Sequence, residues 1–489
     1  MLARRILFLF LLFFFLQNSD GFGLNLDEGE LIVNTELLLS DTSNESHHEA
    51  PGWTVIPFAL LLMMIATGPL FFEHFWHKNY PKIAVILSVV VVLYYFFVLH
   101  NVHAPVHSFF EYFQFISLLT SLYIASGGIN IKVDKKSTPR ANAIILIIGA
   151  IIANIIGTTG ASMLLIRPFV RLNKDRIKAY HIVFFIFIVS NVGGALTPIG
   201  DPPLFLGFLK GVPFFWTLEH NLFPWLIAVI FLVIVFIFVD RRNHTDEEDE
   251  PVTYTNKTSI IGTRNFIWLA IVVSAVFLDP NVFEWVPAII YEGTKFSFVR
   301  EIIMLTVAYL SYRFANQEAI KSNDFNFEPI REVAFIFVGI FATMMPALEM
   351  VSAFASSPEG MQLINHNTLY WGTGILSGFL DNAPTYINFL TAAMASKGAD
   401  IGTFSHVVEF SKEGIYENSV LSLKAISIAS VFFGALTYIG NGPNFMVKSI
   451  AEQVGIKMPS FFGYIIRFSI PILLPLFLLT WLIFFYFSG

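Results

Sequence analysis

Two short segments of the chain repeat one another and carry polar residues that could bind an ion. Residues 194–203 read GALTPIGDPP and residues 434–443 read GALTYIGNGP, which are identical at seven of ten positions. Gly and Pro leave backbone carbonyls without helical partners, and Thr, Asn and Asp add side-chain oxygens, so both segments offer hard ligands to a cation such as sodium. The candidate ligands are Thr197, Gly200, Asp201, Thr437, Gly440 and Asn441. The alternative, that Gly and Pro merely kink buried helices, is disfavoured by the repetition.

Each repeated segment follows an apolar stretch that is itself interrupted by Gly, Pro or polar residues. These stretches are ANIIGTTGASMLL at 153–165 and SGFLDNAPTYINF at 377–389. Interruptions at corresponding places in two halves of a membrane protein indicate a transporter binding site, where the C-termini of half-helices add negative potential. The pairing predicts a site formed by two hairpins and two unwound helices.

Two aspartates, Asp201 and Asp381, fall within these interrupted segments, and neither has a basic residue within a helical turn in sequence. A carboxylate at the bilayer centre costs about 3 kcal/mol on insertion scales, so one kept there binds, pairs or carries protons. If it is protonated when empty and ionised around sodium, the two ions compete for one charge and exchange. We predict that Thr197, Asp201, Asp381 and Asn441 bind Na⁺ and that both aspartates carry protons. The alternative is that each aspartate caps a half-helix.

Other ionisable residues are weaker candidates. Glu332 and Glu349 lie near opposite ends of an apolar segment, where a position at the membrane surface explains both, although Glu349 is kept as a possible proton-linked residue. His181 begins a helix beside basic residues and is expected at the membrane surface rather than in a proton relay. The group His100, His103 and His107 is interpreted as a loop, because Pro105 interrupts helical spacing.

The elements that must position these residues are membrane helices. Hydrophobic residues make up 55% of the 489 residues and charged residues only 13%, which excludes an ordinary soluble domain. Long apolar runs containing Gly and Pro favour an all-α polytopic bundle over a barrel of short alternating strands. The net charge is -7, most acidic residues lie in loops, and no basic patch suited to nucleic acid is found. The absence of cysteine excludes thiol chemistry and disulfides.

The distribution of Lys and Arg orients the segments, because cationic loops stay in the cytoplasm. Apolar stretches at 53–72, 82–99 and 109–126 read as crossings, whereas 141–168 has basic residues at both ends and reads as a re-entrant hairpin. The second half reaches its own hairpin from the opposite side, which predicts two inverted-topology repeats, each with a re-entrant hairpin and a broken transmembrane helix. The predicted divisions are a signal peptide or anchor (1–23), a polar extracytoplasmic segment (24–52), the first repeat (53–240), an acidic cytoplasmic linker (241–264) and the second repeat (265–489).

At these residues the sequence resembles the ion transporter superfamily, especially the NhaD-like sodium/proton antiporters and their citrate-transporter-like (CitMHS-type) and arsenite-pump relatives. The matching segments are SNVGGALTPIGDPPLFLGF at 190–208, DNAPTYINF at 381–389 and GALTYIGNGPNFM at 434–446. The resemblance extends from about Trp53 to Phe487. Its motifs are more specific for the superfamily than for the substrate.

The resemblance implies a scaffold with a mobile transport region, alternating access by an elevator-like movement, and a homodimer. It pairs the first hairpin tip, at Asn154, Thr158 and Thr159, with residues 197–201. It pairs Asp381, Asn382 and Thr385 with residues 437–441. Divalent-carboxylate members carry Ser-Asn-Thr at both tips, whereas this sequence has Gly-Thr-Thr-Gly and Asp-Asn-Ala-Pro. The added aspartate would repel an anion, which favours cation exchange.

The predicted function is a Na⁺/H⁺ antiporter of the inner (plasma) membrane, not an enzyme, with Na⁺ as the transported or coupling ion and no cofactor. One rival is a symporter that carries citrate, a dicarboxylate or another anion with sodium or protons. A second rival is an intramembrane aspartyl protease, whose two aspartates share a proton. Such enzymes carry Gly two residues before a Gly-Asp pair, where this sequence has Pro198. A passive channel would not need paired inverted hairpins.

Overall fold

The computed structural model describes residues 50–133, 137–174, 176–243, 258–280, 283, 285–291 and 294–487, which belong to one compact unit. The expected signal segment 1–23 lies outside the described residues, as do nearly all of segment 24–52 and the acidic part of the linker, 244–257. Within the described residues, eight helical stretches are long and apolar enough to cross a membrane. The prediction of an all-α polytopic membrane protein is therefore confirmed.

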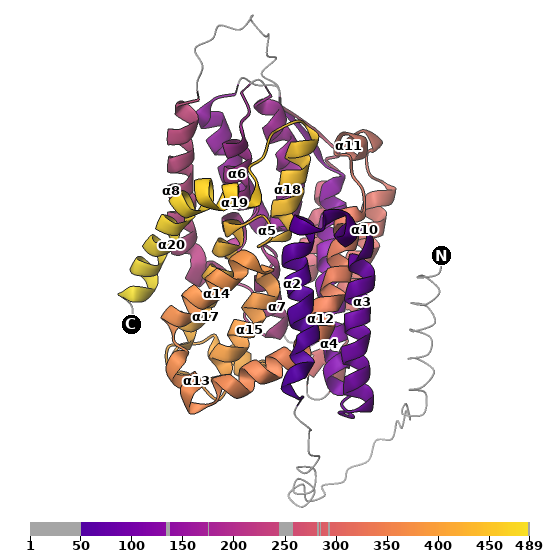
Figure 1. The fold of residues 1–489 in the computed structure, drawn as a ribbon. Helices are drawn as coiled ribbons and strands as arrows, with labels where there is room; N and C mark the ends of the chain where they lie inside the picture. Colours follow the sequence, from indigo (N-terminus) through magenta and orange to yellow (C-terminus); the bar gives the residue numbers. More distant parts are fainter. Residues whose placement is uncertain are drawn as a thin grey trace, which may run out of the picture. The chain divides into compact units, whose positions relative to one another are not determined.

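The elements of the first half follow in chain order (Figure 1). They are η2 (Gly52–Val55), α2 (Ile56–Phe71), α3 (Glu73–Phe97), α4 (His103–Gly127), β1 (Asn130–Val133), α5 (Pro139–Leu172), α6 (Ala179–Ile188), η3 (Val192–Leu196), α7 (Pro202–Lys210) and α8 (Trp216–Arg241).

The second half begins with β2 (Thr258–Ile261), α9 (Asn265–Val276), β3 (Ile289–Tyr291), β4 (Thr294–Phe296), α10 (Val299–Arg313), α11 (Gln317–Ser322), α12 (Glu328–Ala355) and α13 (Pro358–Leu363). It continues with α14 (His366–Phe379), α15 (Asn382–Ala395), α16 (Phe404–Phe410), α17 (Ser419–Phe433), η4 (Gly434–Leu436) and α18 (Gly442–Gln453). The last helical stretch is divided into α19 (Phe461–Tyr464), η5 (Ile465–Leu473), α20 (Leu474–Trp481) and η6 (Leu482–Tyr486).

Helices α2, α3, α4, α9, α10 and α12 pack mainly on one another and are called the helix panel below. Helix α12 lies against α2, α3 and α4, as Figure 1 shows, and α10 packs on α4 and α9. The outward faces of the panel carry exposed aliphatic and aromatic side chains, including Ile86, Val90 and Ile302. Such faces suit contact with lipid rather than water.

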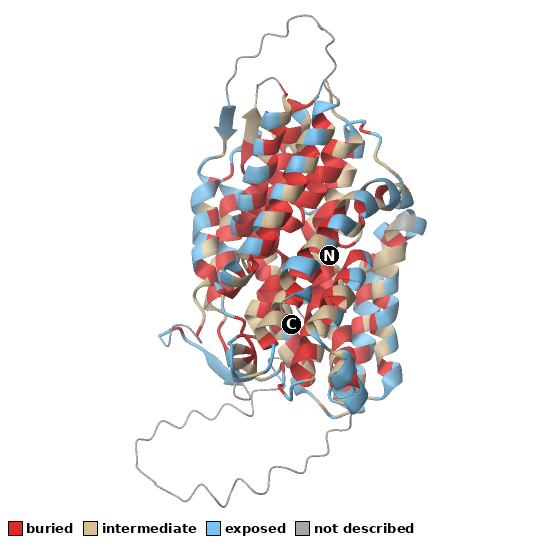
Figure 2. Ribbon diagram, turned by 90° about the vertical axis from the view of Figure 1, so that its left-hand side faces the viewer, coloured by how far each residue is buried: buried red, intermediate tan, exposed pale blue. Residues whose placement is uncertain are grey.

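A second group of helices, α5 to α8, α14, α15, α17 and α18, is called the hairpin bundle below. Helix α6, with the sequence AYHIVFFIFI, is apolar on all sides, and its residues 182–188 have no exposed surface. An apolar helix without a polar face belongs in the interior, which is where it lies. Figure 2 shows buried residues filling this interior and exposed residues on the outside.

The basic loops predicted to be cytoplasmic gather at one end of the helices. Strand β1 pairs antiparallel with β2, so the last residues of the predicted linker are part of a small sheet. Lys132 Nζ lies 2.7 Å from Glu318 Oε1, and Arg167 Nε lies 3.7 Å from Asp324 Oδ2, so these ion pairs join segments of both halves. The grouping agrees with the alternation of crossings read from the positive charges.

One sequence expectation at the other end was wrong. Helix α4 begins at His103, so His103 and His107 are helical and not part of a loop. Pro105 is compatible with this start because the first turn of a helix needs no backbone N–H from it. The third crossing therefore begins before residue 109.

Candidate functional site

The first predicted hairpin consists of the two helical arms of α5, which meet at Gly157, where the backbone is not helical. Asn142 Nδ2 donates to Asn173 Oδ1 over 2.8 Å although the two are 31 residues apart, a separation of roughly 46 Å in a straight helix. Gly157 turns the chain with φ 79° and ψ 155°. Only glycine adopts these angles without strain, so the Gly in Gly-Thr-Thr-Gly defines the tip.

The hairpin tip is hydrogen-bonded to the first broken helix, the stretch between α6 and α7. Thr197 Oγ1 donates to Asn154 O over 2.6 Å, and Leu196 N donates to Asn154 Oδ1 over 2.8 Å. Thr158 N donates to Gly200 O over 2.8 Å. The unwound carbonyls and amides are thus satisfied by the tip, which is how irregular backbone is tolerated away from water.

The second hairpin is formed by α14 and α15, which meet at Leu380 and Asp381. A Cβ built on Gly372 would lie 2.9 Å from the ring of Phe389, so the two helices run back along each other in close contact. Asp381 occupies the N-cap of α15, where its Oδ1 accepts from Ala383 N over 3.0 Å.

The two halves repeat the same contact between hairpin and broken helix. Thr437 Oγ1 donates to Gly378 O over 2.6 Å, as Thr197 Oγ1 does to Asn154 O. The same hydroxyl accepts from Gly440 N over 3.2 Å, and Thr197 Oγ1 accepts from Gly200 N over 3.1 Å. The repeated threonines therefore hold the unwound segments in place, and both are already engaged with protein partners.

The glycines of the repeated motif close each unwound segment into a loop. A Cβ on Gly200 would lie 2.1 Å from Gly194 O, and one on Gly440 would lie 2.7 Å from Gly434 O. Real Cβ atoms do not approach backbone oxygens this closely, so both positions need glycine for close approach of the chain rather than for a special torsion. The candidates Gly200 and Gly440 act here as loop-closing residues.

Asp201 is the point at which both hairpins and both broken helices meet. Its side chain is 1% exposed. Thr158 Oγ1 donates to Asp201 Oδ1 over 2.7 Å, Asn441 Nδ2 donates to the same oxygen over 3.0 Å, and Asn382 Nδ2 donates to Oδ2. Three candidate residues predicted from other segments therefore donate hydrogen bonds to one carboxylate, which is not used to cap its own helix.

A buried oxygen beside Asp201 has no partner. Asn382 is fully buried, its Nδ2 is committed to Asp201, and its Oδ1 accepts no hydrogen bond from any described residue. An unsatisfied buried amide oxygen costs about 1–3 kcal/mol. Because an amide oxygen is an acceptor only, this atom calls for a cation or a proton donor.

The remaining predicted residues take other positions. Thr385 Oγ1 donates to Asp381 O within its own helix. Thr159 is half-buried and makes no side-chain hydrogen bond among the described residues. Glu349 is exposed and accepts from Tyr95 Oη over 2.8 Å, at the far end of α12 beside α3, and it is not part of the Asp201 cluster.

Two asparagines of the cluster were passed over in the sequence. Asn191 Nδ2 donates to Asn444 Oδ1 over 2.7 Å, and Asn191 Oδ1 accepts from Asn441 Nδ2 over 3.3 Å. Asn444 also donates to the carbonyls of Gly434 and Thr437. Both lie inside the quoted motifs, so a count of buried amides in those motifs could have identified them.

Helix ends of both kinds meet at this junction. Asp201, Asp381 and Asn441 are the N-caps of α7, α15 and α18, and α6, α14 and η4 end nearby. The sequence predicted negative potential from C-termini, and the structure adds positive potential from these N-termini. The partial positive charge of these N-termini partly offsets the cost of burying the Asp201 carboxylate.

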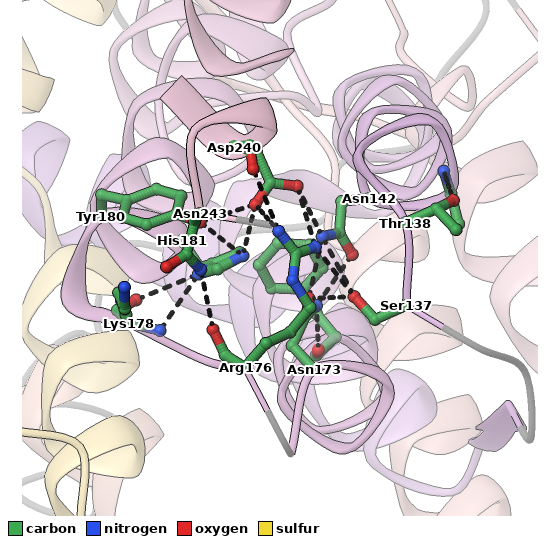
Figure 3. Close-up of polar contacts among 12 residues, drawn as sticks. Ser137, Thr138, Asn142, Asn173, Arg176, Lys178, Tyr180, His181, Asp240 and Asn243 are labelled. Atoms are coloured by element: carbon green, nitrogen blue, oxygen red, sulfur yellow. Dashed lines mark hydrogen bonds and ion pairs between the residues drawn. The ribbon is translucent and has the colours of Figure 1, made fainter. Parts of the chain in front are cut away.

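A buried charge network holds the open end of the first hairpin (Figure 3). Asp240, at the end of α8, has no exposed surface and accepts from Arg176, from Tyr180 Oη over 2.6 Å and from Asn142 Nδ2 over 3.1 Å. His181 Nε2 lies 3.1 Å from the same carboxylate. His181 has no exposed surface, and Asp240 supplies a partner for it inside the protein at the start of α6.

Comparison with known protein families gives a match over most of the chain. A model of the family described as "Putative citrate transport" matches residues 47–485. The matched range contains both hairpins, both broken helices and the helix panel. No curated protein matches the chain.

Proposed function

The chain belongs to this CitMHS-type family of membrane transporters, and we propose that it is a sodium/proton antiporter of the inner membrane. A transporter of this family is a multi-pass membrane protein that moves a small solute. The identity of the solute is argued from the site.

The observation that carries the proposal is a buried carboxylate whose hydrogen-bond partners include no cationic side chain among the described residues. Asp201 is 1% exposed, and its contacts among the described residues are the hydroxyl of Thr158 and the amides of Asn382 and Asn441. An isolated buried carboxylate is neutralised by a proton or by a bound cation. Since both compete for one charge, binding of sodium releases the proton, and the site exchanges the two ions.

The residues present fit a sodium ion. Asp201 has lone pairs beyond those used by its three donors, and Asn382 Oδ1 is an enclosed oxygen with no partner. Asp381 adds a second carboxylate next to Asn382, at the start of α15. Carboxylate and amide oxygens are the ligands that hard cations prefer. Asp201, Asn382 and Asp381 would hold the ion, and the hydroxyls of Thr197 and Thr437 would keep the loops in place.

Alternating access would move the hairpin bundle along the helix panel. The repeated contacts of Thr197 and Thr437 support an origin of the bundle in two inverted repeats. The Asp240 network joins the first hairpin to α6 and α8, so these elements would move together rather than open at the hairpin base. An elevator-like movement of the whole bundle fits this rigidity.

A second candidate is a symporter of citrate or another carboxylate. Two observations favour it: the description of the family, and the three helix N-termini at the junction, which suit an anion. Asp201 and Asp381 oppose it, since two carboxylates repel an anionic substrate. Sodium bound at Asp201 would reduce this repulsion, so a transport measurement must decide between the antiporter and the symporter.

The deciding experiment uses the full chain in proteoliposomes with an acidic lumen and a pH-sensitive dye. Addition of sodium to the outside should collapse the gradient, choline should not, and citrate should neither be taken up nor change the rate. Asp201→Asn should abolish the response. Asp400→Asn is the matched control, because Asp400 is an exposed loop aspartate that accepts from Gly402 N over 3.1 Å. Sodium-dependent uptake of labelled citrate without a sodium-driven pH change would replace the antiporter by the symporter.

A further inference from the structure

Helix α7 connects the proposed ion site to a buried ion pair at its other end. Asp201 precedes the first residue of α7, and Lys210 is the last of its nine residues. Lys210 Nζ lies 2.6 Å from Glu111 Oε1, and each side chain is 11% exposed. A helix of this length spans about 13 Å, and its backbone hydrogen bonds keep its two ends at a nearly fixed distance. A shift of Asp201 therefore also shifts Lys210.

The Lys210–Glu111 pair crosses the junction between the hairpin bundle and the helix panel. Glu111 lies on α4, which packs on α9, α10 and α12. Lys210 lies on α7, which packs mainly on α15 and α17. The pair is thus a charged contact between the two groups of helices.

Several charged residues of the helix panel surround the pair. Glu111 Oε1 also lies 3.3 Å from Nδ1 of His107 on the same helix. A cavity of about 40 Å³ at this junction is lined by His107, Glu111, Lys210, Asp279, Lys295 and Arg300, among other residues. Arg300 Nε lies 2.7 Å from Glu301 Oε1, and Arg300 Nη1 lies 3.4 Å from Asp279 Oδ2. Of the charged residues that line the cavity, Lys210 is the one from the hairpin bundle.

We infer that the Lys210–Glu111 pair is a latch that stabilises this conformation and breaks each time the hairpin bundle moves along the helix panel. The inference rests on the proposed alternating access. Because Lys210 Nζ and Glu111 Oε1 are only 2.6 Å apart, a displacement of a few ångströms separates the two charges. Separation inside a protein is costly because the interior screens charge poorly. The cavity beside the pair is large enough for water, which can solvate the charges once they part.

The test measures the population of this conformation by cross-linking. The natural sequence has no cysteine, so an introduced pair is the sole reactive pair in the protein. Ser356→Cys and Ala395→Cys report on the junction of α12 with α15, because Ser356 Oγ donates to Ala395 O over 3.3 Å. The rate of disulfide formation under a fixed oxidant then follows the time spent in this conformation.

In that background Lys210→Met and Glu111→Gln should each slow cross-linking about tenfold, which corresponds to about 1.4 kcal/mol. The double exchange Glu111→Lys with Lys210→Glu should restore most of the rate, and Lys210→Arg should retain it. Lys448→Met is the matched control, because Lys448 pairs with Glu452 over 2.8 Å within α18 and joins no two groups of helices.

Unchanged cross-linking in both single variants would overturn the latch, as would slowed cross-linking that the charge exchange fails to restore. Folding is checked by size-exclusion elution. Where the neutral variants are not recovered, Glu111→Asp takes their place, because its shorter side chain lengthens the 2.6 Å contact and should also slow cross-linking. Cross-linking needs no sodium transport, so the two proposals fail separately. A wild type without exchange contradicts the antiporter, whereas an active wild type with insensitive cross-linking contradicts the latch alone.

Discussion

Replacement of Asp201 by asparagine removes the charge at the centre of the cluster while its shape stays nearly the same. Thr158 and Asn441 can still donate to the remaining oxygen, Oδ1. The new amide nitrogen takes the place of Oδ2 and faces Nδ2 of Asn382, so two donors oppose one another. The change therefore tests the charge and one hydrogen bond, and it creates no cavity.

The expected effect on folding is small because two contributions oppose each other. Hydrogen bonds to a charged group contribute about 1.5–3 kcal/mol each and those to a neutral group about 0.5–1.5 kcal/mol, so the loss over three donors is about 3–5 kcal/mol. Removal of a buried carboxylate returns about 3 kcal/mol on insertion scales. The variant should remain folded, within about 2 kcal/mol of the wild type.

The expected effect on sodium binding is large. A ligand at one hundred times its Kd stabilises the folded wild type by about 2.7 kcal/mol. This stabilisation requires Asp201 and should disappear in Asp201→Asn. Thermal unfolding in detergent should show a sodium-dependent rise in Tm for the wild type, no such rise for the variant, and no rise with choline for either. Sodium-driven proton movement should fall at least about a hundredfold.

The reasoning would be refuted if Asp201→Asn, at equal protein and with a normal elution profile, exchanged sodium for protons at the wild-type rate. Asp381→Asn adds a second comparison, because asparagine caps a helix as well as aspartate does. The α15 cap at Ala383 N should survive, so loss of exchange in this variant reports on the charge and not on the helix. We expect exchange to be lost in both variants.

Three further changes test the parts that support the site. Asn382→Ala should weaken sodium binding at least about tenfold in Tm titrations, because Asp201 loses a hydrogen-bond donor and the ion loses an oxygen ligand. Thr385→Ala is the control and should leave sodium binding unchanged, because the Thr385 hydroxyl bonds within its own helix. Gly200→Ala should destabilise the protein by more than about 3 kcal/mol, since its Cβ would lie 2.1 Å from Gly194 O, whereas Gly442→Ala, with nothing within 4 Å, should be neutral in the same unfolding assay. Asp240→Asn should cost about 3–5 kcal/mol by leaving Arg176 unpaired, and a Tm within 1 °C of the wild type would contradict this.

The repeated motif and the two interrupted stretches were predictable because broken helices need Gly, Pro and polar residues at fixed places. Thr197, Thr437 and Asn382 were identified in this way. Thr197 contacts the first hairpin tip as predicted. Asn382 was predicted to pair with residues 437–441, but it donates to Asp201 of the first broken helix instead. The sequence also identified Gly200 as important and predicted that it binds the ion. In the structure Gly200 closes the unwound segment into a loop. Close approach of two backbones depends on the path of the chain, which the spacing alone does not reveal.

The difference between the two aspartates was not predictable. Asp201 and Asp381 both precede a half-helix, and a carboxylate in that position either caps the helix or turns away from it. Asp381 accepts from its own α15, whereas Asp201 is turned toward three side chains from other elements. Partners that lie up to 240 residues away along the chain decide the outcome.

Buried charges outside the motifs were missed for a different reason. Asp240 stands beside Arg241 and Arg242 in sequence and reads as a solvated helix end, yet it is enclosed by the first hairpin. Glu111 lies inside the apolar stretch 109–126 and did offer a signal, because an acid in a crossing needs a partner. Its partner, Lys210, is on another helix and could not be identified from the sequence.

The polar residues of the junction are arranged asymmetrically, and this bears on the mechanism. Thr158 and Asn382 follow the two hairpin tips and occupy equivalent positions, as do Asp201 and Asn441 after the two threonines. The first half contributes its carboxylate from a broken helix, whereas the second contributes Asp381 from a hairpin tip. Asp201 nevertheless accepts two of its three hydrogen bonds from the second half. A site built in this way is lost if the halves separate, so a movement that preserves it must carry both hairpins and both broken helices together. Rocking of one half against the other would pull Asn382 and Asn441 away from Asp201 in every cycle, which favours displacement of the hairpin bundle as one body.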